Sequence, residues 1–280
     1  MSAKEFHLKI TPYNASELPS RLLAADSQLS RQQVKQAMHK GAVWLTHAKH
    51  TRRLRRDQAQ LKPGDKLHLY FNPEVLQQEP LEPKLIADEE EYSVWCKPAG
   101  MLSQGSKWSD HTTLTRWAEL HIQPQRPAFL VHRLDRFADG LMLIAHTKSM
   151  ARQLSGKFEN REVEKLYNVW VHGEFPGQGE AVHIDKPLDG KSAISLAQRI
   201  GFDADSNQSL LEVRIETGRK HQVRRHLAGV GFPVVGDKLH GENETGDLRL
   251  SAVLIAFEHP QSGERKRYEL KEKADSSNDH

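Results

Sequence analysis

A proline-containing segment divides this chain into two parts of different character. Residues 72–86, NPEVLQQEPLEPKLI, carry three prolines and no regular apolar spacing. Proline lacks a backbone N–H and fixes φ, so such a segment disfavours both a helix and a central strand. With 280 residues, of which 37% are hydrophobic, the chain can build more than one core. We therefore predict domains at residues 1–75 and 89–270, a linker at 76–88 and a disordered tail at 271–280.

The N-terminal part shows helix and strand signals in close succession. Ser30 followed by Gln33 matches a capping box, and apolar residues then recur at helical spacing until Gly41. The stretch LPSRLLAAD predicts an earlier helix. Strands are expected at residues 43–46 and 66–71, the second behind a Pro-Gly-Asp turn. These signals predict a small α/β domain.

The positive charge of the chain is concentrated in the same part. Residues 1–80 hold 13 Lys and Arg against 7 Asp and Glu, whereas residues 81–280 hold 27 against 30. A solvated loop would explain the basic run THAKHTRRLRRD equally well. However, residues 13–71 resemble the small S4-like RNA-binding module first recognised in a protein of the small ribosomal subunit. That resemblance implies RNA binding, which we assign to Arg31, Lys35, Arg52, Arg53, Arg55 and Arg56.

The C-terminal part is rich in strands separated by irregular turns. Strands are predicted at YSVWCK, GLMLIAH, LYNVWVHG, LLEVRIET and LSAVLIAFEH, with a helix at residues 149–158. Strands that dominate without regular alternation with helices favour a mixed α+β fold over a doubly wound one.

Several classes of protein do not fit the composition. The single cysteine, Cys96, cannot close an intramolecular disulfide, and the 16 histidines show no zinc-site spacing with it. The N-terminus has no apolar signal region, and no window approaches the roughly 18 apolar residues of a membrane span. We expect a soluble cytoplasmic protein without bound metal.

Four stretches carry candidate chemistry. In VHRLDRFADG, Asp135 lies between Arg133 and Arg136, although a surface ion pair would explain the acid if it stood alone. CKPAGMLSQG forms a turn after a strand, and KLYNVWVHG places Tyr167 in a strand where an aromatic is usually core. In TGRKHQVRRHLAGVGFPVVGD, a strand is expected to end at residues 217–218 and to be followed by a cationic helix, which is a plausible phosphate site. That helix is expected to carry Arg219, Lys220, His221, Arg224 and Arg225.

In combination and in order, these stretches resemble the RluA-type RNA pseudouridine synthases over residues 89–260. The resemblance implies the pseudouridine synthase fold, with a mixed, mainly antiparallel sheet. It also implies an isomerase that needs neither cofactor nor metal. Asp135 would be the catalyst, Arg224 its ion-pair partner, Arg133 the side chain that fills the gap left by a flipped uridine, and Tyr167 a residue that packs on the uracil and suits removal of the C5 proton. Further substrate-binding residues are expected at His132, Arg219, His221 and Gln222.

The chain departs from the family pattern at two places. Residues 138–139 read Ala-Asp where the family has two hydroxyl residues, and Ser251 replaces a histidine or leucine. The leading prediction is a monomeric enzyme that converts uridine to pseudouridine in structured ribosomal or transfer RNA. A catalytically weak or inactive RNA-binding protein on this scaffold is the alternative, and a glycosidase using Asp135 and Asp139 is a third. Whether Asp135 attacks the sugar or the base, or removes a sugar proton, stays open.

Overall fold

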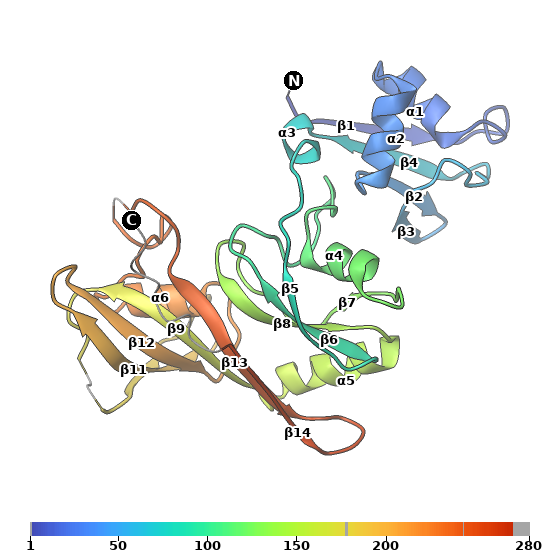
Figure 1. The fold of residues 1–280 in the computed structure, drawn as a ribbon. Coiled ribbons are helices and arrows are strands. Elements are labelled where there is room, and N and C mark those ends of the chain that lie inside the picture. The colour runs from blue at the N-terminus through green and yellow to red at the C-terminus, as the bar shows by residue number, and fades with distance from the viewer. Residues whose placement is uncertain (1, 177–178, 243, 271–280) are drawn as a thin grey trace, which may run out of the picture. The chain divides into compact units, whose positions relative to one another are not determined.

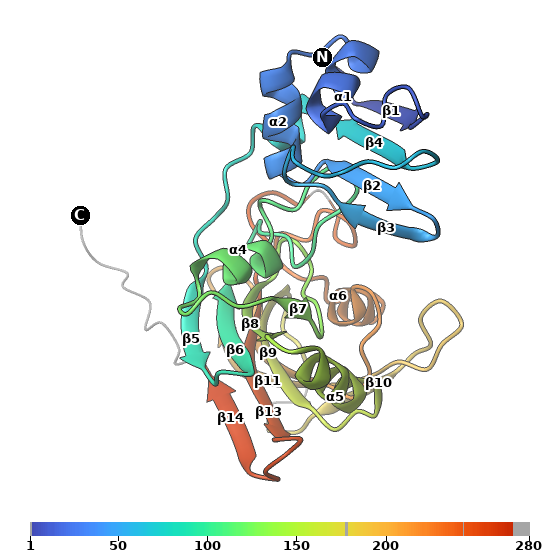
Figure 2. The same cartoon turned by 90° about the vertical axis from the view of Figure 1, so that its right-hand side faces the viewer.

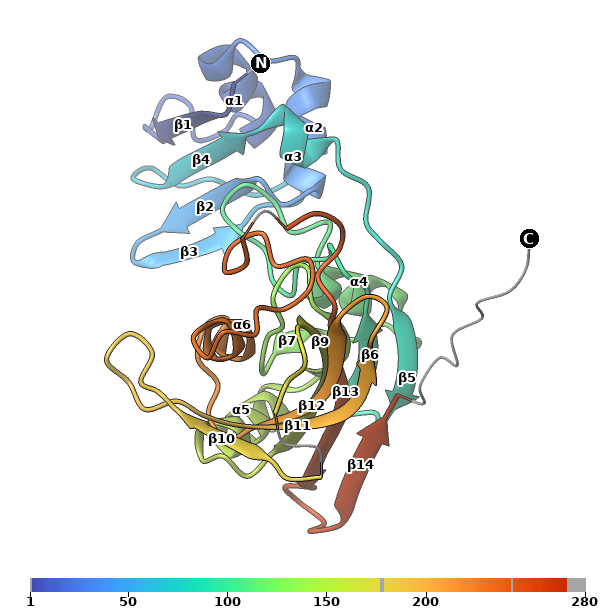
Figure 3. The same ribbon diagram turned by 90° about the vertical axis from the view of Figure 1, so that its left-hand side faces the viewer.

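The computed structural model describes residues 2–176, 179–242 and 244–270, and the predicted tail at 271–280 lies outside them. By its internal contacts the chain divides into two compact units. Unit 1 contains residues 1–81 and 104–121, and unit 2 contains residues 82–103 and 122–280. Figure 1 labels most of the elements of both, and β10 is labelled in Figures 2 and 3. No helix in the described part of the chain has the length and apolar character needed to cross a membrane.

Unit 1 is an antiparallel sheet covered on one face by two helices. Its strand order is β1-β4-β2-β3. Its elements are β1 (Lys4–Lys9), α1 (Pro19–Ser27), α2 (Arg31–His39), β2 (Val43–His47), β3 (His50–Arg53), β4 (Lys66–Phe71), α3 (Pro73–Leu76) and α4 (Leu114–His121).

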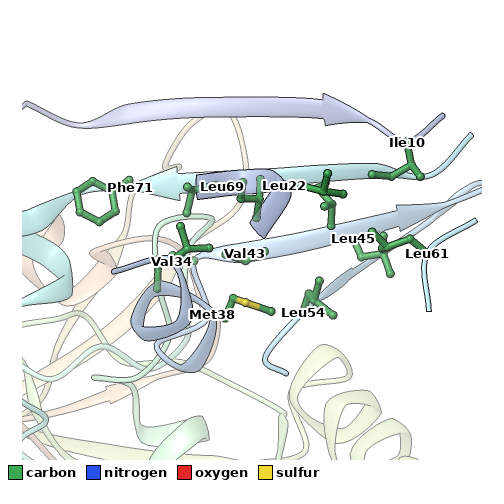
Figure 4. Packing of buried hydrophobic residues seen from close by; sticks show 14 of the residues in the cluster. Ile10, Leu22, Val34, Met38, Val43, Leu45, Leu54, Leu61, Leu69 and Phe71 are labelled. Atoms are coloured by element: carbon green, nitrogen blue, oxygen red, sulfur yellow. The ribbon is translucent and has the colours of Figure 1, made fainter. Parts of the chain in front are cut away.

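The predicted capping box is present at the start of α2. Ser30 accepts a hydrogen bond from the backbone N–H of Gln33, and the Gln33 side chain accepts one from the backbone N–H of Ser30. The helix then buries Val34 and Met38 against the sheet, as Figure 4 shows. Complete burial of one such side chain contributes about 1.5–3 kcal/mol. A short amphipathic helix in this unit is therefore held by its packed face.

The segment expected to be a linker contains regular structure. Residues 73–76 form α3, with Pro73 at the first helical position, where its missing N–H is not needed. Residues 84–88 form β5 at the edge of the larger sheet, where the segment pairs with one neighbouring strand only. An edge position tolerates nearby prolines because fewer backbone N–H groups are needed for pairing. The prolines therefore shape an edge strand and a helix start instead of removing all structure.

The described part of unit 2 forms a ten-stranded, mainly antiparallel sheet, and the predicted fold class is confirmed. The order along its main path is β10-β11-β12-β9-β13-β8-β6-β5, while β14 pairs with β13 and β7 with β8. Its elements are β5 (Lys84–Asp88), β6 (Tyr92–Lys97), β7 (Phe129–Leu130), β8 (Asp139–Ala145), α5 (Lys148–Glu159), β9 (Glu164–His172), β10 (Val182–Asp185), β11 (Ile194–Asp203), β12 (Gln208–Ile215), α6 (Gln222–Ala228), β13 (Leu250–Glu258) and β14 (Arg265–Glu269).

Strand β8 explains why an apolar run follows the polar stretch around Asp135. Residues 141–145 are all buried, because β8 lies between β6 and β13 and is covered on both faces. At its start Gly140 has φ +111°, and a Cβ there would lie 2.3 Å from the carbonyl oxygen of Ala252 on β13. A glycine is thus required where the loop carrying Asp135 enters the sheet.

Figures 2 and 3 show α5 and α6 on the same side of the unit 2 sheet. The surface between the two helices is formed by β9, β12 and β13, the strands that carry Tyr167, Ile215 and Leu250. This arrangement leaves a hollow with helix side chains on its flanks and strand side chains on its floor.

Candidate active site

A cavity of about 650 Å³ lies over the sheet of unit 2. It is lined by residues 131–135, by α5, by strands β9, β12 and β13, and by the segment from Thr217 into α6. All eight residues expected in the catalytic centre line this one cavity: His132, Arg133, Asp135, Tyr167, Arg219, His221, Gln222 and Arg224. The fold thus brings together residues far apart in sequence, such as Asp135 and Arg224, which are 89 positions apart.

Asp135 forms an ion pair with Arg224 in this cavity. Nη1 of Arg224 donates to Oδ2 of Asp135 over 3.2 Å, and the Asp135 side chain is 21% exposed. Nε2 of His221 lies 3.7 Å from the other carboxylate oxygen. The carboxylate therefore lies in the cavity lining between a guanidinium and an imidazole.

Arg224 is itself fixed by a second carboxylate. Its Nε donates to Oδ2 of Asp237 over 2.9 Å, and its Nη2 donates to the other oxygen of the same group. Burial alone would lower the pKa of Arg224, but the hydrogen bonds to Asp237 and Asp135 outweigh burial and raise it. Burial likewise opposes ionisation of Asp237, yet the hydrogen bonds from Arg224 and from the Leu239 N–H lower its pKa. The bidentate contact sets the plane of the guanidinium, and this plane decides where the third nitrogen points.

Tyr167 lies on β9 beside the ion pair. Burial and the negative charge of Asp135 raise the pKa of its phenol, so the group is protonated at neutral pH. A protonated phenol can pack against a ring and donate a hydrogen bond, and removal of the C5 proton by Tyr167 stays a prediction.

A buried lysine holds the loop that carries Asp135. Lys97 lies at the end of β6, and its ammonium group donates to the carbonyl oxygens of Pro98, Met101, Arg136 and Ala138 over 2.5–3.2 Å. Burial lowers the pKa of Lys97 to about 8. The KPAG turn and the loop after Asp135 are therefore joined through one side chain. The sequence pattern gave Lys97 no role, although a lysine as the last residue of the buried strand β6 was the available signal.

Two predicted substrate-binding residues are engaged within the protein. Nε2 of His132 accepts from the backbone N–H of Leu143 over 2.9 Å, and its ring stacks on Phe158 with centroids 4.3 Å apart. Burial lowers the pKa of His132 to about 3, so the ring is neutral. The amide of Gln222 accepts from Thr217 and donates to the Ile194 carbonyl oxygen. These two residues shape the cavity wall, and binding of substrate by them stays a prediction.

The predicted cationic helix is shorter than expected. Helix α6 begins at Gln222, and His221 precedes it with φ +54°, in the left-handed region. Arg219 and Lys220 lie in the turn before it, where the N–H of Arg219 donates to the Gln222 side chain. The prediction that Arg219, Lys220 and His221 lie on the helix is therefore wrong. A turn closed by the Gln222 amide competes with a helical turn at this point.

Both departures from the family pattern lie side by side. Asp139 opens β8, and its register partner on the parallel strand β13 is Ser251. Ala138 is buried and lines the cavity, whereas Asp139 is outside that lining among the described residues. The two substitutions thus share one contact between neighbouring strands.

Comparison with known proteins agrees with this geometry. The family described as RNA pseudouridylate synthase matches residues 91–229. An uncharacterized RNA pseudouridine synthase of Chloroflexus aurantiacus is 30% identical, over 94% of this chain and 89% of that protein. A tRNA pseudouridine synthase C of Haemophilus ducreyi is 34% identical, over 59% of this chain and 81% of that protein.

A solved human structure, RNA Pseudouridylate Synthase Domain Containing 1, shares the fold. Its TM-score is 0.58 at 20% identity, over 70% of this chain and 86% of that one. The chain belongs to the RNA pseudouridine synthase family, of the RluA type that the sequence motifs indicated. It is an isomerase that acts on RNA.

The predicted RNA-binding residues all lie in unit 1. Arg53 and Arg55 both contact Asp110, the former over 3.0 Å between Nε and Oδ2. Arg31 and Lys35 lie 3.9 and 3.6 Å from Asp57 with half of each side chain exposed. Arg52 and Arg56 are exposed. The six residues therefore differ in how much of their charge faces solvent.

Proposed function

We propose that this enzyme converts uridine to pseudouridine in a structured transfer or ribosomal RNA, with Asp135 as the catalytic carboxylate. The observation that carries the proposal is the Asp237–Arg224–Asp135 arrangement inside a cavity of about 650 Å³. One guanidinium between two carboxylates leaves one net negative charge. Asp237 is buried behind Arg224 whereas Asp135 lines the cavity, so Asp135 is the carboxylate that a substrate can reach as a nucleophile or a base.

The proposed reaction needs the uridine outside the RNA stack. Flipping a nucleotide costs a few kcal/mol of stacking, and the cavity must repay this. In our proposal Tyr167 packs against the extruded uracil, and exposed Arg133 at the cavity lining fills the space left in the RNA. The bond from C1′ of ribose to N1 of uracil breaks, the base turns, and a bond from C1′ to C5 forms. The C5 proton then leaves, and N1 gains a proton, so the mass of the RNA is unchanged.

Transfer RNA is the first substrate to test. The relative from Haemophilus ducreyi, which is 34% identical over 59% of this chain, is named tRNA pseudouridine synthase C. Ribosomal RNA remains the second substrate class, since the basic unit 1 suits any structured polyanion.

Unit 1 is proposed to add RNA affinity that depends on salt concentration. A groove of about 220 Å³ beside α2 is lined by Lys35, His39, Arg55 and Arg56, among others. Cations around a groove of this size suit phosphate oxygens. Because Asp110 accepts from Arg53 and Arg55, we expect Arg52 and Arg56 to carry most of the contact with RNA.

The test compares wild type with two matched variants. Purified protein is incubated with transfer and ribosomal RNA transcripts, and pseudouridine is mapped by carbodiimide modification and primer extension. Asp135→Asn should abolish the product, whereas Asp139→Asn makes the same change outside the cavity lining and should retain most of it. Equal pseudouridine content with wild type and Asp135→Asn would refute the assignment. Release of uracil would instead indicate the glycosidase.

A further inference from the structure

Lys165 is a second charged residue whose burial needs an explanation. It lies on β9 two residues before Tyr167, so both side chains leave the same face of the strand about 6.6 Å apart. Lys165 is 8% exposed, and both residues line the cavity. Lys165 opens the motif KLYNVWVHG, whose pattern predicted a role for Tyr167 alone.

The ammonium group of Lys165 has no acceptor in the described protein. Its nearest recorded contact is the Phe158 ring, whose centroid is 5.7 Å from Nζ. No ion pair or hydrogen bond of this side chain occurs among the described residues. Burial lowers its pKa to about 8, with no compensating negative charge. The Nζ atom is not one of the fully buried, unpartnered atoms of the described residues, so it reaches the cavity, where a ligand can supply the acceptor.

The surroundings of Lys165 leave a place for an anion. Uncharged neighbours are the Phe158 ring and His132, which is neutral because burial lowers its pKa to about 3. Glu159 and Arg161, beside the end of α5, are exposed and also line this cavity. Burial lowers the pKa of Lys165, and the negative charge of Asp135 does not counteract this lowering. Lys165 is therefore not an ion-pair partner of Asp135.

We propose that Lys165 binds a phosphate group of the RNA substrate at the wall of the cavity. The inference rests on the proposed function, because it names a substrate contact of the same site. An ammonium group at the wall of a cavity binds an anionic oxygen more strongly than a neutral uracil carbonyl. The bound phosphate would hold the flipped nucleotide while Asp135 acts on its sugar or base.

The decisive variant is Lys165→Met, with Lys148→Met on the exposed start of α5 as its control. Loss of a charge-assisted contact should raise KM for RNA about tenfold while kcat stays within about twofold, tenfold being about 1.4 kcal/mol. The plot of log affinity against log salt concentration should become less steep, by about the amount that one phosphate contact contributes. The melting temperature should rise or stay unchanged, because an unpartnered buried charge is removed. Lys165→Arg should keep most of the affinity.

Protection from acylation gives a readout that does not depend on turnover. Because its pKa is low, Lys165 should react with acetic anhydride at neutral pH faster than exposed lysines. Uridine 5′-monophosphate and a substrate RNA should slow this reaction, whereas uridine should not. Protection by uridine would show that Lys165 binds the nucleoside and not a phosphate group. Unchanged KM and salt slope in Lys165→Met, with a lower melting temperature, would make Lys165 structural and overturn the inference.

Failure of the proposed reaction and failure of the proposed phosphate site give different results. If wild type makes no pseudouridine but Lys165 is protected by RNA, the proposed reaction is wrong and the phosphate site stands. If pseudouridine forms and no RNA protects Lys165, the reaction stands and the phosphate site is wrong.

Discussion

Lys97 and Lys165 occupy two regions of unit 2 that bury a lysine in opposite ways. Both have a pKa lowered to about 8 by burial. Lys97, beneath the Asp135 loop, donates to four backbone carbonyl oxygens, whereas Lys165 at the cavity wall has an aromatic face as its neighbour. A buried charge with a full set of protein partners holds structure together. A buried charge without protein partners can instead form its hydrogen bonds with a ligand.

The largest effect is expected from Lys97→Met. Four carbonyl oxygens would lose their donor, so the free energy of unfolding should fall by about 2–4 kcal/mol and activity by about 100-fold or more. Denaturant unfolding and the pseudouridine assay measure the two quantities. Lys84→Met at the exposed edge strand β5 is the control. Equal and small stability changes in Lys97→Met and Lys165→Met would remove the contrast between the two regions.

Asp237→Asn tests a third buried cation, Arg224, which has two carboxylate partners. Without the charged bidentate contact the guanidinium should turn away from Asp135, and kcat should fall about 10–100-fold. RNA affinity should change little, since Asp237 is buried behind Arg224. Asp237→Glu keeps the charge and should recover part of kcat in the same steady-state assay. Full activity of Asp237→Asn would show that Arg224 needs no anchor.

The pH dependence should separate the two lysines. Each keeps its proton below a pKa of about 8 and loses it as pH rises through that value. Loss of charge at Lys165 should raise KM for RNA several-fold between about pH 7 and 9, whereas loss at Lys97 should loosen the Asp135 loop and lower kcat. Lys165→Arg should abolish the change in KM and leave the decline of kcat. Parallel changes of both constants in that variant would mean that one group controls both.

The smallest effect is expected in unit 1. Arg52→Gln with Arg56→Gln removes two exposed charges, so RNA affinity should fall a few-fold and the salt slope by about 1.4–1.8, without a change in melting temperature. Arg53→Gln with Arg55→Gln leaves Asp110 without its cations and should lower stability by about 1–2 kcal/mol. Filter binding at several salt concentrations and thermal unfolding distinguish the pairs. The reverse pattern would place the RNA contact at Arg53 and Arg55.

Much of the fold could be predicted because its signals are local. The capping box at Ser30, the alternation in residues 66–71 and the apolar run of residues 141–145 each lie within a few residues of one another. Strands β1 and β3 were missed, since KEFHLK and HTRR are mostly exposed and polar. Residues 104–121 gave no signal that they pack in unit 1, where the Asp110 contacts with Arg53 and Arg55 help to hold them.

The sequence by itself determined the strand-rich fold class, because this depends on short-range spacing and composition. Its motifs indicated the family through their resemblance to known members. The tertiary structure decided which charges are partnered. It joined Asp237 to Arg224, set Asp139 opposite Ser251, gave Lys97 four carbonyl oxygens and gave Lys165 none within the described residues. The partners of a buried charge come from segments far apart in sequence. Whether that charge supports structure or awaits a ligand is therefore fixed by packing.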